Sequence, residues 1–119
     1  MSICQVNETN SSKVLGKALL NAGKALGLSQ DETGEIIGKA RTSIFRNGIN
    51  PDSKEGELSI LLIRVFRSLF VLVGDDNVNM KHWMKTQNSH LRGIPAQQIK
   101  KITGLLKVVE YLDSMRGKV

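Results

Sequence analysis

Five polar side chains between residues 30 and 46 have the types and the spacing needed to contact DNA. Arg46 can donate two parallel hydrogen bonds to the edge of a guanine, and Thr42 and Ser43 can contact base edges or phosphates. Arg41 can reach either the DNA backbone or a base, and Gln30 stands where a side chain can meet a phosphate. Whether these groups share one interface depends on the helices that carry them.

The residues around these side chains predict two short helices joined by a glycine turn, within the range Leu28 to Asn47. Ser29 and Glu32 form the pattern S-x-x-E, a capping box, and a cap of this kind typically stabilises a helix start by about 1 kcal/mol. Gly38 predicts the turn, because the chain bends there without a side chain that would clash. Gly34 is small enough for the second helix to cross closely above it.

The second of these helices is expected to bury Ala40 and Ile44, which are four residues apart. At about 100° per residue, Thr42 and Arg46 then point outward, with Phe45 on the flank. We expect Phe45 to pack against the following linker, with contact to a thymine methyl group as the alternative. The spacing predicts a helix-turn-helix that reads DNA, and an ordinary helical hairpin is the alternative.

The rest of the chain also shows helical spacing of its apolar residues, so we predict an all-α fold. A turn-rich linker containing Pro51 separates the helix-turn-helix from a long apolar helix. Pro95 is well placed as the first residue of a later short helix. We therefore expect a disordered arm, a helix-turn-helix module, a central helix and a small C-terminal helical domain, at residues 1–12, 13–50, 55–73 and 74–119.

The central helix is apolar around nearly its whole circumference, and only Arg64, Arg67 and Ser68 make a narrow polar edge. Such a helix must be covered on more than one side. The other helices of so small a chain are expected to cover about half of it. A homodimer would cover the rest, because burying an extra Leu or Phe is worth about 1.5–3 kcal/mol. The alternative is a central core helix in a monomer.

Charge and cysteine content favour a nucleic-acid partner and argue against metal chemistry. The net charge is +6, although the most basic part is the C-terminal third. Cys4 is the only cysteine, so the chain can form neither an internal disulfide nor a cysteine cluster for zinc. His82 and His90 lack a metal-binding pattern. We expect no metal, cofactor or small-molecule substrate, and, since no catalytic triad or phosphate-binding loop appears, no enzyme.

The apolar stretch at residues 58–73 is too short and too charged to span a bilayer. The first residues lack the basic start and the apolar core of a signal peptide. We therefore expect a cytoplasmic protein without a membrane partner.

Residues 74–119 carry a series of motifs in a characteristic order. They are a Gly-Asp start, a Trp-hydrophobic pair, a Leu-x-Gly-x-Pro loop and a closing Gly-x-x-x-Val helix with Tyr-Leu. In this chain, the four motifs are, in the same order, Gly74-Asp75, Trp83-Met84, Leu91 with Gly93 and Pro95, and Gly104 with Val108 and Tyr111-Leu112. In these motifs the chain resembles the C-terminal domain of the Xre/MbcA/ParS antitoxins. It departs from the pattern at Gln87, where a proline is common, and at Arg92, where a second glycine is common.

The resemblance implies a type II toxin–antitoxin system. Proteins similar to this one dimerise, bind a RES-domain toxin that consumes NAD, and repress their own operon by binding operator DNA. It also implies that the extreme C-terminus can enter the toxin's active-site cleft. A cationic tail ending in a carboxylate could occupy a site that accepts a pyrophosphate. The toxin-binding residues expected on this basis are Arg116, Gly117, Lys118 and Val119.

Two alternatives to this function remain open. The first is a stand-alone helix-turn-helix transcriptional regulator without a toxin partner. The second is an interaction protein with a degenerate DNA module, because Lys39 stands where a buried aliphatic residue usually follows the turn glycine.

Overall fold

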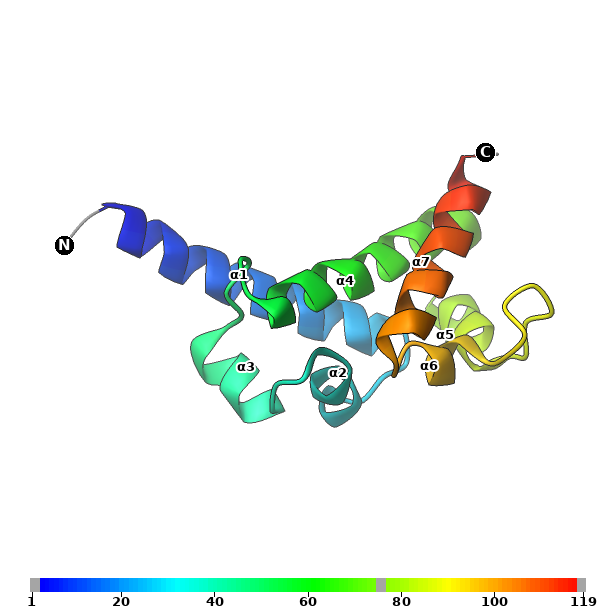
Figure 1. Cartoon of the computed structure of the whole chain (residues 1–119), viewed down its shortest axis with the longest axis horizontal. Helices are drawn as coiled ribbons and strands as arrows, with labels where there is room; N and C mark the ends of the chain where they lie inside the picture. Colours follow the sequence, from blue (N-terminus) through cyan, green and yellow to red (C-terminus); the bar gives the residue numbers. More distant parts are fainter. Residues whose placement is uncertain (1–2, 75–76, 118–119) are drawn as a thin grey trace.

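Seven α-helices make up the part of the chain that the computed structural model describes, residues 3–74 and 77–117 (Figure 1). No β-sheet occurs in these residues, so the predicted all-α fold is confirmed. Along the chain the helices are α1 (Ile3–Ala25), α2 (Gln30–Ile37), α3 (Arg41–Asn47), α4 (Lys54–Val73), α5 (Asn77–Lys85), α6 (Pro95–Gln98) and α7 (Ile102–Arg116).

The long helix α4 forms the centre of the hydrophobic core. Its N-cap is Ser53, whose side chain accepts a hydrogen bond from the Gly56 N–H at 3.0 Å. Leu62, Val65 and Leu69 are fully buried, because α4 packs against α1 near one end and α7 near the other. The chain's own helices therefore bury one side of α4 and leave most of its other apolar side chains half-buried. A few large apolar side chains of α4 remain exposed, namely Ile60, Phe70 and Val71.

Helix α1 begins earlier than the sequence indicates. Residues 3–12, expected to belong to a disordered arm, are helical. No glycine or proline interrupts this stretch, and each residue added to an existing helix gains a hydrogen bond, which favours a longer helix. The Ser12 carbonyl accepts a hydrogen bond from the Ile49 N–H at 2.9 Å, which joins α1 to the segment after α3.

The predicted capping box at the start of α2 is confirmed. The Ser29 hydroxyl accepts a hydrogen bond from the Glu32 N–H, and the Glu32 carboxylate accepts one from the Ser29 N–H, each at 3.0 Å. These hydrogen bonds, above all the one from the Ser29 backbone, hold the pKa of Glu32 below its usual value. Helix α2 ends at Ile37, and its C-cap Gly38 has a φ of 80°, in the left-handed region that a glycine turn requires.

The C-terminal helices complete the core on the other side. Met80 and Met84 of α5 are fully buried in the core. Helix α6 begins at Pro95, as predicted. Helix α7 begins at Ile102, two residues before Gly104, and is joined to α4 by an exposed ion pair between Arg64 and Asp113 at 2.7 Å. Asp75, part of the Gly-Asp motif before α5, lies outside the described residues.

The loop between α5 and α6 keeps a tight shape in spite of its arginine. Arg92 has a φ of 57°, in the left-handed region, and no other described non-glycine residue has a positive φ. The neighbouring Gly93 exchanges backbone hydrogen bonds with Asn88 at 2.8 and 3.3 Å. A side chain at a left-handed position costs about 1–2 kcal/mol, which explains why the resemblance places a glycine there.

We therefore expect Arg92→Gly to raise the free energy of unfolding by about 1 kcal/mol, a gain partly offset by the freer unfolded chain. Thermal unfolding followed by circular dichroism would measure it. Arg92→Ala is the matched control, since it removes the side chain but keeps the backbone strain. Equal stabilisation by the two variants would mean that the gain comes from removing the arginine side chain and not from relieving backbone strain.

Candidate nucleic-acid interface

Helix α3 is held by apolar residues at its inner face and just beyond its end. Ile44 and Ile49 are both buried, with exposed fractions of 2% and 0%. The expectation that Ala40 is buried is wrong, because Ala40 is the exposed N-cap of α3, with extended backbone angles. Ile49 supplies the second inward side chain instead, since the chain turns back toward the core after Gly48.

Two glycines allow α3 to lie directly against α1. A Cβ atom added to Gly16 would lie 3.0 Å from the Gly48 Cα and 3.3 Å from the Ile44 carbonyl oxygen. A Cβ added to Gly48 would collide with the Ser12 carbonyl, and Gly48 has a φ of 72°. The two backbones are thus in contact, which fixes the position of α3 on α1.

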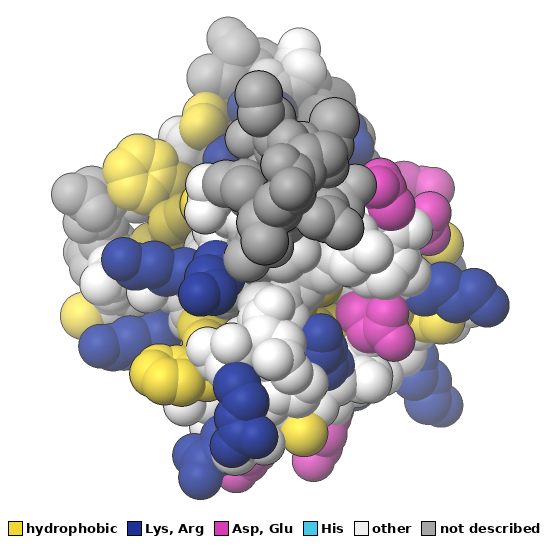
Figure 2. All heavy atoms as spheres, turned by 90° about the vertical axis from the view of Figure 1, so that its left-hand side faces the viewer, with side chains coloured by type: hydrophobic (Ala, Val, Ile, Leu, Met, Phe, Trp, Pro, Cys, Tyr) yellow, Lys and Arg dark blue, Asp and Glu magenta, His cyan; other side chains and the backbone are white. Residues whose placement is uncertain are grey.

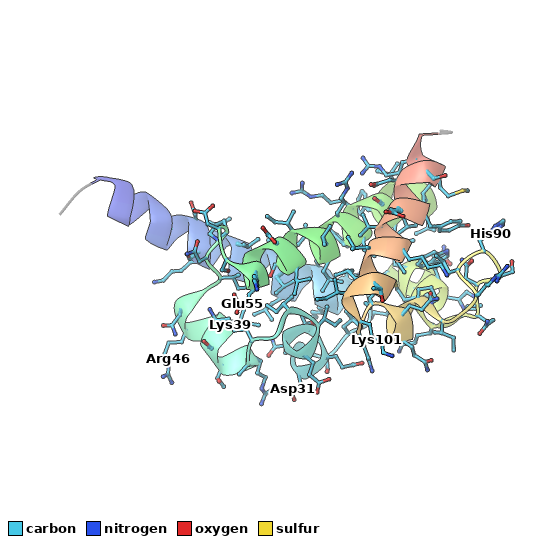
Figure 3. The ribbon with its side chains drawn as sticks, viewed as in Figure 1. Asp31, Lys39, Arg46, Glu55, His90 and Lys101 are labelled. Atoms are coloured by element: carbon cyan, nitrogen blue, oxygen red, sulfur yellow. The ribbon has the colours of Figure 1, made fainter. Side chains whose placement is uncertain are left out.

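Lys39 closes the turn between α2 and α3. Its Nζ donates a hydrogen bond to the Gly48 carbonyl at 2.8 Å, so one side chain joins the start of α3 to its end (Figure 3). The Lys39 backbone carbonyl in turn lies directly above Gly34, where a Cβ atom would collide with it. The predicted close crossing at Gly34 is therefore present, and Lys39 supports the turn rather than disrupting it.

The structure divides the predicted DNA-contact residues between two hollows. Gln30 and Arg46 line a hollow of about 420 Å³ between α1 and α3. Arg41 and Thr42 line a second hollow, of about 540 Å³, between α2 and α3. These four side chains are exposed, and Arg46 points away from the body of the molecule (Figure 3). Ser43 is half-buried and lines neither hollow.

The two hollows differ in charge. The second contains carboxylates, and Arg41 pairs with Asp31 at 3.3 Å, an exposed ion pair of a kind worth only about 0.2–1 kcal/mol. The hollow between α1 and α3 is lined by Lys13, Lys17 and Arg46 and by no Asp or Glu. Figure 2, which views the end of the molecule where α3 lies, shows Lys and Arg side chains spread over this surface with hydrophobic patches between them. The hollow between α1 and α3 is therefore the more favourable site for a polyanion.

Two of these cations were not among the predicted DNA contacts, and one aromatic ring lies elsewhere than predicted. Lys13 and Lys17 stand four residues apart, a spacing that places them on one face of α1 and that was readable from the sequence. The expectation that Phe45 packs against the linker is wrong, because its side chain is 85% exposed and lines the same hollow. Ile44 and Ile49 cover the inner side of α3, so Phe45 has no core to enter.

The predicted toxin-binding residues lie far from this interface. Arg116 ends α7, and in Figure 1 this end of α7 lies in the right half of the molecule, whereas α3 lies in the left half. Its Nη1 donates a hydrogen bond of 3.4 Å to the Ser68 hydroxyl of α4, and both Arg116 and Gly117 are exposed. Lys118 and Val119 lie outside the described residues.

The described residues contain neither a metal-binding cluster nor a membrane-spanning helix. No group of three or more His, Cys, Asp or Glu residues there could hold a metal ion. His90 instead stacks on Tyr111, with ring centroids 5.6 Å apart, which joins the loop before α6 to α7. None of the helices in residues 3–74 and 77–117 is long and apolar enough to cross a membrane.

A helix-turn-helix beside a cationic hollow, followed by a separate set of C-terminal helices, defines a DNA-binding regulator with a second domain. The chain belongs to the Xre-like antitoxins. Residues 5–64 match the family model of the antitoxin Xre-like helix-turn-helix domain, and residues 68–118 match that of the antitoxin Xre/MbcA/ParS C-terminal toxin-binding domain. No curated protein matches the chain in a sequence search.

The two matches together identify a DNA-binding type II antitoxin, a non-enzymatic regulator. The first match extends into α4, beyond the 13–50 range predicted for the helix-turn-helix module.

Proposed function

We propose that this antitoxin neutralises a RES-domain toxin that consumes NAD, and that it represses its own operon as a homodimer. The observation that carries the proposal is the presence of both domains in one chain, a DNA-binding module and a toxin-binding domain. Their distal ends are well separated, so one molecule can hold DNA at α3 and a toxin at the end of α7.

The end of α7 is the part of the chain proposed to enter the toxin's cleft. Arg116 is exposed there, and the sequence places Lys118 two residues further on. Guanidinium and ammonium groups form strong hydrogen bonds with carboxylates and phosphates. A cationic segment at the mouth of a nucleotide site can therefore hold acidic groups of the cleft and keep NAD out.

The test is the NAD consumption of the toxin encoded by the adjacent reading frame, measured with and without the antitoxin. We expect the full chain to stop NAD loss, and a chain ending at Met115 to inhibit at least tenfold less. Lys101→Ala is a matched control, because this exposed cation precedes the opposite end of the same helix (Figure 3). A full chain that leaves NAD consumption unchanged would overturn the toxin assignment, whereas equal inhibition by the shortened chain would overturn only the role of the tail.

The homodimer is proposed to form along the exposed stripe of α4. The stripe consists of residues three or four positions apart, Glu57, Ile60, Arg64, Arg67 and Val71, which lie on one side of the helix and are all exposed. It borders a hollow of about 600 Å³ whose lining includes Val14 of α1, 67% exposed. Covering these apolar groups would stabilise an association.

The charges along the stripe favour an antiparallel pairing of two α4 helices. Glu57 lies in the first turn and Arg67 almost three turns later. In an antiparallel arrangement centred near Leu62, Glu57 of one copy faces Arg67 of the other, and the symmetry of the dimer forms this pair twice. Arg64, near the centre, is already neutralised by Asp113 of its own chain, which reduces the repulsion between the two copies.

A further inference from the structure

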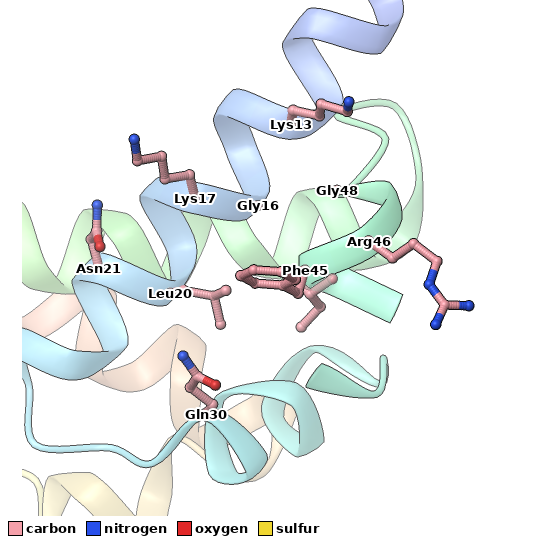
Figure 4. A pocket seen from close by; sticks show the side chains of 10 residues that line it. Lys13, Gly16, Lys17, Leu20, Asn21, Gln30, Phe45, Arg46 and Gly48 are labelled. Atoms are coloured by element: carbon pink, nitrogen blue, oxygen red, sulfur yellow. The ribbon is translucent and has the colours of Figure 1, made fainter. Parts of the chain in front are cut away.

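Phe45 is an aromatic side chain on the DNA-facing helix that the fold does not use. It is 85% exposed, although phenylalanine is among the residue types most often buried. In the hollow between α1 and α3 its ring faces Leu20 of α1, and Gln30 of α2 lies below Leu20 in the same view (Figure 4). The ring therefore lies with Leu20 and Ile44 in the apolar part of a depression that is also lined by cationic and polar side chains.

The surroundings of the ring match the chemistry of a DNA major groove. Lys13 and Lys17 stand on α1 above the ring, and Arg46 follows it on α3 (Figure 4). No carboxylate lines the hollow, so its positive charge is not compensated from within. Among the four bases only thymine presents a methyl group in the major groove, and apolar side chains discriminate it by contact with that methyl.

We propose that the hollow between α1 and α3 receives operator DNA, with Phe45 against the 5-methyl group of a thymine and with Lys13 and Lys17 on the neighbouring phosphates. This inference rests on DNA binding by the helix-turn-helix and deepens it, because it names a base and extends the contact surface to α1.

The probe is a DNA duplex selected from a random-sequence pool by the full chain, in which each thymine in turn is replaced by uracil. This replacement removes only the methyl group. We expect one position in each half-site at which the wild-type chain loses about three- to fivefold in affinity. Phe45→Ala should bind the selected duplex more weakly than the wild-type chain does. Replacing the thymine at that position by uracil should then cause no further loss of affinity, because the variant has no ring to contact the methyl group.

The lysines are tested by the dependence of binding on salt. Lys17→Gln should weaken binding to all duplexes alike and reduce the slope of log K against log salt by about 0.9 for the lost phosphate contact. Lys24→Gln is the matched control, since Lys24 is exposed on α1 but does not line the hollow. We expect this variant to keep the wild-type slope.

Three results would overturn the inference. Phe45→Ala could respond to every uracil replacement as the wild-type chain does, in which case the ring reads no methyl group. It could bind the selected duplex as tightly as the wild-type chain, as expected if an acidic apolar segment of a protein occupies the hollow instead. A wild-type chain that selects no duplex would refute DNA binding itself. Circular dichroism should show an unchanged fold, because the ring of Phe45 is mostly exposed.

Discussion

Replacing Gly48 with alanine is expected to lower the free energy of unfolding by about 3–5 kcal/mol. The residue has a φ of 72° and a ψ of −158°, a conformation open essentially only to glycine, which costs other residues about 1–3 kcal/mol. In addition, the new Cβ would collide with the Ser12 carbonyl, which is backbone and cannot rotate away. Relieving that collision requires α3 to move off α1, and overpacking of this kind typically costs about 1–3 kcal/mol.

Gly74 provides a matched control for the conformational part of this cost. Its φ of 80° and ψ of −171° are close to those of Gly48, but a Cβ added there would meet nothing within 4 Å. Gly74→Ala should therefore cost only about 1–3 kcal/mol. Urea unfolding of both variants would measure the two costs. If the two variants lost the same stability, the contact between α1 and α3 would contribute nothing, and the position of α3 would depend on other interactions.

Local signals in the sequence were enough to predict the helix-turn-helix itself. The capping box at Ser29 and the turn at Gly38 depend on residues within one turn of each other, and both are present in the structure. Pro95 begins α6 for the same reason, because its fixed φ and missing N–H suit a first helical position. The division of the chain at the Pro51 linker was harder to judge, because α4 packs on α1 as well as on α7.

The composition of the interface could be predicted only in part, because it depends on contacts between distant segments. Helical spacing placed Thr42 and Arg46 on the outer side of α3, where they lie. It did not reveal that Ile49 replaces Ala40 as the second inward residue, which follows from the turn at Gly48. With that turn in place Phe45 faces α1 across a hollow, and the lysines of α1 enter the same surface.

Reversing one charge on the exposed stripe of α4 is expected to convert the proposed homodimer to a monomer. Glu57→Arg places an arginine opposite Arg67 of the other copy, and Arg67→Glu places two glutamates opposite each other. Each single change replaces two attractive contacts by two repulsive ones, because of the symmetry. Like charges brought together in an interface cost several kcal/mol of binding free energy. This cost corresponds to a loss in dimer affinity of at least about a hundredfold.

The double variant Glu57→Arg with Arg67→Glu separates this register from other modes of dimerisation. It restores both attractive pairs with their signs exchanged, so we expect the mass measured by light scattering after gel filtration to return to that of the dimer. Both residues are exposed and neither forms an ion pair within the described part of the chain, so the fold of each copy should survive. A double variant that stays monomeric would exclude the antiparallel register, and single variants that remain dimeric would place the interface elsewhere.

Because a helix-turn-helix dimer contacts two half-sites at once, the monomeric variants should also bind operator DNA far more weakly, and the double variant should recover the affinity for operator DNA.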